Sequence, residues 1–261
     1  MGKIIAFVNQ KGGVGKTTSS INLAASLGVL NKKVLLVDLD PQGNSTTGIG
    51  ISKTEYNKSA YELLTDKATI DEVILKSKFK NLYIIPATVN LAGIDIEFMQ
   101  AGVVDSTFNR GGQLKKYLLP AKELFDYIII DCPPSLGVIT TNALTAADSV
   151  IIPIQCEFFA LEGVMQLINN IMFAQKHLNP TLDIEGVLLT MLDSRTNLGL
   201  EVVEDIRSYF KERVYDTIIP RLVRLSEAPS HGKPILAYDP HSRGTEAYLN
   251  LAKEVITRNG N

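Results

Sequence analysis

The stretch "NQKGGVGKTT", residues 9–18, decides the fold of this chain. Its glycines and the following Lys16 and Thr17 are the residue types that a phosphate-binding loop uses. The strict pattern, G-x-x-x-x-G-K-[ST], also places a glycine six residues before the lysine, where this chain has Gln10. A second lysine, Lys11, follows directly. The stretch therefore deviates from the strict pattern at one position and contains one lysine more than the pattern requires.

The sequence on both sides of this loop predicts the structure that a phosphate cradle needs. A β-branched apolar run precedes it at residues 3–9, and a helical pattern follows at residues 17–30. Backbone N–H groups at glycines can approach phosphate oxygens, and the helix N-terminus adds its positive dipole end. We expect Lys16 to contact the β- and γ-phosphates and the Thr17 hydroxyl to bind Mg²⁺. The alternative is a glycine-rich turn without a ligand. The nucleotide-binding residues that the motif predicts are Gly12, Gly13, Val14, Gly15, Lys16, Thr17 and Thr18.

Apolar runs alternate with helical patterns along the rest of the chain. The runs are continuously apolar, which is typical of strands buried on both faces. Strands that alternate with helices predict an α/β fold, with a mostly parallel twisted sheet and helices on both faces. Because no repeat or composition break interrupts the pattern, we expect a single domain over residues 1–261. The predicted strands are residues 3–9, 33–40, 81–87, 127–133, 149–155, 186–192 and 215–220, and further helical patterns cover 161–178 and 245–258.

Composition limits the classes of protein to which the chain can belong. The chain has 261 residues, 45% of them hydrophobic, and a formal net charge of −2, so any nucleic-acid contact must come from a local basic patch. We find no apolar run of about 18 residues and no signal-peptide pattern, which predicts a cytoplasmic protein. The two cysteines, Cys132 and Cys156, lie inside apolar runs and are expected to be core thiols.

Two aspartates follow the apolar run "VLLV" in the stretch "VLLVDLDPQGN". Asp38 and Asp40 stand near the carboxyl end of a predicted buried strand, where open α/β sheets bind ligands. Because they are two positions apart, one can face the magnesium shell while the other enters the loop and orients a water. The alternative for Asp40 is a turn, since Asp-Pro-Gln-Gly is a good turn sequence by itself.

A third acid, Asp131, ends the apolar strand in "YIIIDCPPSLG". Four apolar residues followed by an acid is the form of a Walker B strand, which places a carboxylate near the metal. With a phosphate-binding loop upstream, we expect Asp131 to lie in the magnesium shell beside Thr17.

Several segments together resemble the ParA/Soj branch of the MinD/ParA ATPases, which segregate chromosomes and plasmids. The segments are "KGGVGKTT", "LLVDLDPQGN", "IIIDCPPSLG", "PIQCEFFALEG" and "RLSEAPSHGKPI", and the resemblance covers about residues 3–256. It implies a P-loop NTPase of the deviant Walker A type that hydrolyses ATP with Mg²⁺. It also implies an ATP-dependent homodimer that binds double-stranded DNA non-specifically, and a ParB-type centromere-binding partner. Such a protein is cytoplasmic and associated with the nucleoid.

The resemblance also implies a role for the second lysine. In this family the early lysine, here Lys11, crosses the dimer interface and touches the phosphates of the partner's ATP. A charge supplied in trans makes dimerisation depend on the triphosphate and can stabilise the transferring phosphoryl group. The alternative is a solvated loop lysine. The catalytic residues implied are Lys11, Lys16 and Asp40, with Asp40 positioning the attacking water and Asp38 and Asp131 in the metal shell.

The remaining assignments come from the same resemblance. Pro220 and Leu222 match positions that flank the adenine, although relatives often have asparagine where this chain has Leu222. Glu157 and Phe159 match the dimer interface, and the alternative for them is a helix start with core aromatics. The DNA contacts implied are Arg195, Arg221, Arg224 and Lys233, for which solvated surface residues are the alternative.

Two other classes of relative have different requirements. A MinD-like membrane-associated positioning ATPase needs a basic amphipathic tail, but the tail at 245–258 mixes Glu246 and Glu254 with Lys253 and Arg258. We expect that helix to pack on the sheet. Carriers of iron–sulfur clusters need cysteines that bridge a dimer, and only Cys132 follows a Walker B strand here.

Overall fold

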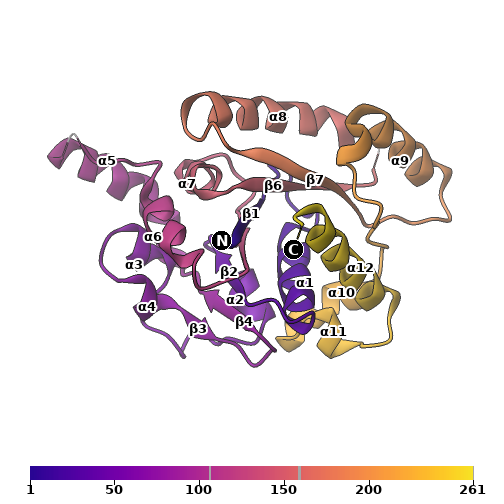
Figure 1. Cartoon of the computed structure of the whole chain (residues 1–261), viewed down its shortest axis with the longest axis horizontal. Helices are drawn as coiled ribbons and strands as arrows, with labels where there is room; N and C mark the ends of the chain where they lie inside the picture. The colour runs from indigo at the N-terminus through magenta and orange to yellow at the C-terminus, as the bar shows by residue number, and fades with distance from the viewer. Residues whose placement is uncertain (106, 158–159, 261) are drawn as a thin grey trace.

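A computed structural model describes residues 1–105, 107–157 and 160–260. A seven-stranded sheet forms its centre, in the order β3-β4-β2-β5-β1-β6-β7 (Figure 1). Within the described residues, neighbouring strands pair in parallel except at the edge, where β3 runs antiparallel to β4. The prediction of a mostly parallel sheet is confirmed. The strands are β1 (Lys3–Phe7), β2 (Val34–Asp38), β3 (Leu75–Lys76), β4 (Leu82–Ile85), β5 (Tyr127–Asp131), β6 (Ser149–Gln155) and β7 (Asp183–Thr190).

Helices connect the strands and cover both faces of the sheet. The longer ones are α1 (Lys16–Val29), α5 (Ile94–Val104), α6 (Gln113–Ala121), α7 (Val138–Ala146), α8 (Ala160–His177), α9 (Asn197–Phe210) and α12 (Arg243–Arg258). The shorter ones are α2 (Asn44–Gly48), α3 (Ala60–Leu64), α4 (Ile70–Val73), α10 (Val223–Glu227), α11 (Ile235–Tyr238) and the 3₁₀ turns η1 (Val89–Gly93), η2 (Lys211–Arg213) and η3 (Ala228–His231).

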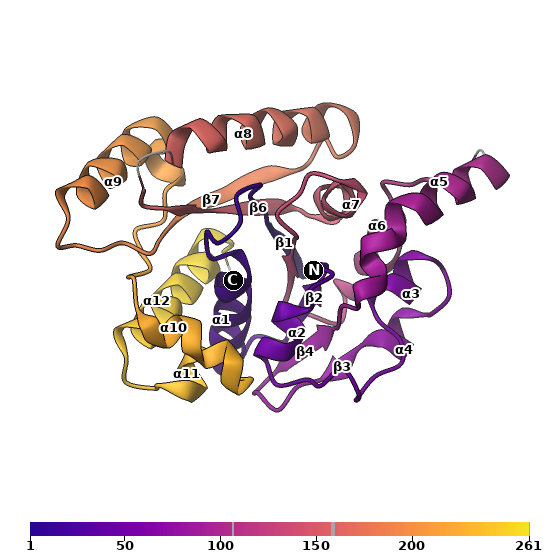
Figure 2. The same ribbon diagram turned by 180° about the vertical axis from the view of Figure 1, so that it is seen from behind.

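The two faces of the sheet pack into two separate hydrophobic cores. Successive side chains of a strand point to opposite faces. In β1, Ile4 and Ala6 therefore join one core, while Ile5 and Phe7 join the other. Figures 1 and 2 show α7, α8 and α9 on one side of the sheet and α1 and α12 on the other. Burial on both faces explains why the strand sequences are continuously apolar.

The C-terminal helix, α12, packs against α1 and belongs to the second core. Its apolar side chains Tyr248, Leu251 and Val255 are at most 1% exposed, and the Tyr248 hydroxyl lies 3.1 Å from Ser19 Oγ of α1. The apolar side of this helix is buried as predicted, but it packs mainly against α1 and not directly on the sheet. In the part of the chain that the structure describes, no helix is long and apolar enough to cross a membrane.

The predicted strand at residues 215–220 is wrong. This segment runs beside the carboxyl end of β7 but makes only isolated bridges, from Val214 to Val187 and from Pro220 to Leu192. The backbone N–H groups of Asp216 and Thr217 bond to a carboxylate of α12 instead of to a strand. Proline has no N–H to donate, so the segment cannot continue a ladder at Pro220.

Candidate functional site

The glycine-rich loop lies between β1 and α1, at the carboxyl end of a central strand. Gly13 and Gly15 have φ angles of 75° and 89°, a left-handed conformation that glycine adopts without steric penalty. The hydroxyl of Thr190, at the end of β7, donates a hydrogen bond of 2.9 Å to the carbonyl of the buried Val14. The loop is therefore fixed to the neighbouring part of the sheet, while Gly12 and Gly13 stay exposed.

Lys16 lies beneath this loop. Its side chain is largely buried, and Nζ donates a hydrogen bond of 3.1 Å to the carbonyl of Lys11. Burial lowers the pKa of the Lys16 ammonium, and the negative charge of Asp131 opposes that shift. A buried cation under a loop of N–H groups at a helix N-terminus is suited to bind a polyphosphate.

Two carboxylates lie side by side at the ends of β2 and β5. Asp38 and Asp131 are directly opposite each other in the strand register, and both are fully buried. Asp131 accepts hydrogen bonds from Ser45 Oγ at 2.7 Å and from Ser20 Oγ at 3.3 Å. The Thr17 side chain also donates to Asp131. The structure thus brings Thr17, Lys16 and Asp131 together, as the motifs predicted.

Asp38 is held by the turn that follows β2. Its Oδ2 accepts from Thr46 N at 2.8 Å and from Thr46 Oγ1 at 2.7 Å, and its Oδ1 accepts from Asp40 N at 3.1 Å. Asp38 therefore organises the loop around Asp40 as well as facing Asp131.

The electrostatics of this pair favour a bound cation. Burial and the charge of Asp131 raise the pKa of Asp38 to about 7. Burial raises the pKa of Asp131 to about 6, against the hydrogen bonds from Ser45 and Thr17. Mg²⁺ binds through one or two carboxylates together with phosphate and water oxygens. The hydroxyl of Thr17 beside the carboxylate of Asp131 supplies oxygen donors of this kind, so the residues present fit the ion.

Asp40 is 8% exposed and begins a turn, because its Oδ1 accepts a hydrogen bond of 2.9 Å from Gln42 N. Its negative charge also influences Lys16 and Asp131, whose pKa values it raises. The Asp40 carboxylate therefore lies among the predicted phosphate and metal ligands. Asp40 also forms the turn that was the alternative interpretation of this residue.

Lys11 and Glu157 form an ion pair within one chain. Lys11 Nζ lies 3.5 Å from Glu157 Oε2, and both side chains are about half exposed. The structure therefore brings together two of the residues assigned to the dimer interface. Phe159, the third, lies outside the described residues, and α8 begins after it at Ala160.

Pro220 and Leu222 line a small pocket beside the P-loop, of about 160 Å³. Gly15 and Thr18 also line it, together with Met191, whose φ of 54° is unusual for a residue with a side chain. The pocket lies next to the N-terminus of α1, so a base could occupy it while the phosphates lie on the loop.

The four predicted DNA contacts are exposed, and two of them, Arg195 and Arg224, are paired with carboxylates. Arg195 binds Asp193 through two bonds, Nε to Oδ1 at 2.8 Å and Nη2 to Oδ2 at 2.6 Å, and lowers the pKa of that acid to about 2. Arg221 also acts electrostatically on Asp193, so it lies near Arg195. Arg224 Nε lies 3.3 Å from an oxygen of Asp239. Lys233 is exposed in the turn before α11.

Four hydroxyl residues of the site were missed in the sequence analysis. Ser20, Ser45 and Thr46 hold the two buried carboxylates, and Thr190 fixes the loop. The hydroxyl-rich run "NSTTG" after Asp40 was a usable signal for Ser45 and Thr46. No local pattern marks Ser20 or Thr190, since each acts on a residue far away in the chain.

Known proteins resemble this chain over nearly its full length. A family model described as "AAA domain" matches residues 2–184. The chain is 59% identical to the sporulation initiation inhibitor protein Soj of Bacillus subtilis, with 98% of each chain covered. It is 50% identical to the chromosome partitioning protein ParA of Myxococcus xanthus, covering 99% of this chain and 89% of that protein. It is 49% identical to the chromosome-partitioning ATPase Soj of Treponema pallidum, covering 100% and 99%.

Solved structures of related proteins also resemble this chain over nearly its full length. Cobyrinic acid a,c-diamide synthase from Mycobacterium smegmatis, with bound ADP and magnesium, superposes with a TM-score of 0.85 at 34% identity, covering 100% of this chain and 97% of that one. The septum site-determining protein MinD from Pyrococcus horikoshii, complexed with Mg-ADP, gives 0.82 at 27% identity, covering 100% and 98%. The chain belongs to the ParA/Soj-type partitioning ATPases of the MinD/ParA family.

Proposed function

We propose that this chain binds ATP–Mg²⁺, dimerises in that state, binds DNA without sequence preference, and returns to a monomer after hydrolysis. The observation that carries the proposal is the pair of lysines on one loop. Lys16 is buried beside Asp131, while Lys11 is exposed on the outer side of the loop. One lysine is placed for the chain's own nucleotide and the other can reach a neighbour.

The phosphates lie on the loop in this proposal. Backbone N–H groups of residues 12–17 and the Lys16 ammonium bind the phosphate oxygens, and the end of α1 adds its dipole. Thr17, Asp131 and Asp38 would hold Mg²⁺, which would screen the phosphate charge and polarise the terminal phosphoryl group. Pro220 and Leu222 enclose the base in the pocket beside Gly15.

Hydrolysis requires a water in line with the terminal phosphate, and Asp40 orients it. Asp40 is supported from two sides, since Asp38 accepts from its backbone N–H and its own carboxylate accepts from Gln42 N. This support fixes the direction of the carboxylate, as a water-positioning group needs. The Lys11 ammonium of a partner stabilises the charge that moves to the leaving oxygen.

The dimer forms through the face that carries Lys11 and Glu157. An ion pair between two half-exposed side chains contributes little stability, so Lys11 can leave Glu157 for a partner's phosphate. Dimerisation brings two copies of Arg195, Arg221, Arg224 and Lys233 into one assembly, which increases the positive charge available to DNA phosphates.

The biological role follows from the relatives, whose names include chromosome partitioning. We infer a role in chromosome or plasmid segregation, in the cytoplasm and on the nucleoid, with a ParB-type protein that stimulates hydrolysis. Residues 1–261 act as one ATPase domain in this proposal.

Gel filtration of the parent chain with ADP, with ATP, and with ATP plus random duplex DNA tests the proposal. We expect a monomer with ADP, a dimer with ATP and a DNA complex only with ATP. Lys16→Ala should lose ATP binding, whereas Lys11→Ala should bind ATP as a monomer and neither dimerise nor hydrolyse it. An equal loss of ATP affinity in both variants would contradict the trans role of Lys11.

A further inference from the structure

Residues 214–222 run from a position beside β7 to the nucleotide pocket. Their far end, Pro220 to Leu222, lines the pocket beside the P-loop. Two backbone hydrogen bonds tie the segment to β7, from Tyr215 N to Val187 O at 3.0 Å and from Ile219 N to Leu189 O at 2.9 Å. Just beyond the end of β7, Leu192 N donates to Ile219 O at 3.2 Å, and Arg221 N donates to Leu192 O at 3.0 Å. Residues 216–218 lie between these attachments.

Two side chains of α12 hold that intervening part. Glu254 Oε1 accepts from Asp216 N at 2.9 Å, and Oε2 accepts from Thr217 N at 3.2 Å. Arg258 Nη2 donates to Val214 O at 2.9 Å and to Glu254 Oε1 at 2.8 Å. The Arg258 guanidinium also lies 4.2 Å from the centre of the Tyr215 ring. Glu254 and Arg258 thus contact four consecutive residues, 214–217.

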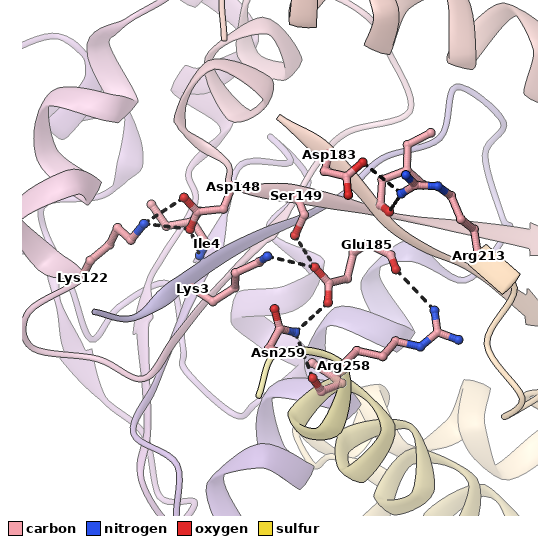
Figure 3. Close-up of polar contacts among 12 residues, drawn as sticks. Lys3, Ile4, Lys122, Asp148, Ser149, Asp183, Glu185, Arg213, Arg258 and Asn259 are labelled. Carbon is pink, nitrogen blue, oxygen red and sulfur yellow. Dashed lines mark hydrogen bonds and ion pairs between the residues drawn. The ribbon is translucent and has the colours of Figure 1, made fainter. Parts of the chain in front are cut away.

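The end of α12 is itself fixed to the sheet. Figure 3 shows Asn259 and Arg258 converging on Glu185 of β7. Asn259 Nδ2 donates to Glu185 Oε1 at 2.6 Å, and Glu185 Oε2 accepts from Ser149 Oγ of β6 at 2.6 Å. Lys3 Nζ of β1 lies 3.3 Å from the same carboxylate. Because this end of the helix is anchored to Glu185, which is itself held by β6 and β1, Glu254 has a defined position relative to the sheet.

Apolar packing does not fill the space on the other side of the segment. A groove of about 470 Å³ separates Asp216, Thr217 and Pro220 from the first half of α12, where Glu246 and Asn250 line it. On this side, Asp216 and Thr217 are held by the two hydrogen bonds to Glu254.

We propose that Glu254 and Arg258 are positioning residues for the nucleotide base. They fix residues 214–217, directly before the stretch that is tied to Leu192, and together with that attachment they hold Pro220 and Leu222 in the pocket wall. This inference rests on the proposed function, because it assumes that the pocket receives the base of ATP. The phosphate loop is built on β1 and α1 and does not use these contacts, so base binding and phosphate binding should respond differently to their loss.

The test compares two probes, ATP and inorganic tripolyphosphate, each with Mg²⁺, by calorimetry at 15 °C. For Glu254→Ala we expect about a tenfold weaker affinity for ATP, because part of the binding free energy must then order the pocket wall that Glu254 helps to hold in the parent chain. The affinity for tripolyphosphate should not change. Glu246→Ala is the matched control, since it removes an exposed carboxylate on the same helix and groove. It should leave both affinities unchanged.

A fall in both affinities together, or in neither, would overturn the inference. If Glu254→Ala does not fold, as judged by circular dichroism, Glu254→Gln and Arg258→Ala serve for the same comparison, with a smaller but still ATP-specific loss expected. A parent chain that binds no ATP would instead contradict the proposed function, so the two failures are distinguishable.

Discussion

Replacing Glu157 by glutamine is expected to tighten ATP-dependent dimerisation. Within one chain, Lys11 Nζ lies 3.5 Å from Glu157 Oε2. Lys11 cannot hold this carboxylate and a partner's phosphate at the same time. Dimerisation therefore breaks the ion pair once in each subunit, and Glu157→Gln removes that competition without changing the shape of the side chain.

The size of the effect follows from the exposure of the pair. Lys11 and Glu157 side chains are 46% and 48% exposed. Two unit charges at this separation in water attract by roughly 1 kcal/mol, and measured exposed pairs contribute about 0.2–1 kcal/mol. With two pairs broken in each dimer, the free energy of dimerisation should improve by about 0.4–2 kcal/mol. The dimer dissociation constant should then fall by roughly 2- to 30-fold.

Sedimentation equilibrium with a non-hydrolysable ATP analogue measures this constant. The control is Glu123→Gln, which removes an exposed carboxylate at the opposite end of the sheet and should leave dimerisation unchanged. At about 1 M salt the difference between parent and Glu157→Gln should shrink, because exposed charges are screened. A weaker dimer for Glu157→Gln would refute the reasoning, since it would mean that Glu157 contacts the partner and does not compete for Lys11.

Two further predictions concern hydrolysis and DNA. Asp40→Ala should bind ATP and dimerise but lose about 10²-fold or more in turnover, and its dimers should persist after a chase with ADP. Normal phosphate release by Asp40→Ala would contradict the water-positioning role. It would mean that Asp40 only stabilises the turn, by accepting the hydrogen bond from Gln42 N. Asp38→Ala, which loses a carboxylate of the predicted metal shell, should also weaken Mg²⁺-dependent ATP affinity. Replacing Arg195 or Arg224 by alanine should weaken binding to all DNA sequences alike and reduce the slope of log K against log salt by about 0.9. An unchanged slope, measured by fluorescence anisotropy, would identify them as surface residues bound only to Asp193 and Asp239.

The sequence alone determined the sheet class and the position of the phosphate loop. Both depend on short stretches of sequence. Continuous apolar runs indicate strands buried on two faces, and the loop motif contains the glycines that its backbone angles require. The carboxylates of Asp38 and Asp131 were also predictable, because each ends a recognisable strand. Parallel strands bring their carboxyl ends to one edge of the sheet, so these acids had to lie near the loop.

Only the tertiary structure decided which partners complete the site. The bonds from Ser20 to Asp131, from Thr190 to Val14 and from Asp216 N to Glu254 join residues between 38 and 176 positions apart. Such contacts depend on how helices pack across the sheet, and no local pattern of residue types encodes that packing. The predicted strand at 215–220 failed for the same reason. Its apolar residues suit a strand, but Glu254, on a helix later in the chain, accepts hydrogen bonds from the N–H groups of Asp216 and Thr217, and the segment leaves the β7 ladder there.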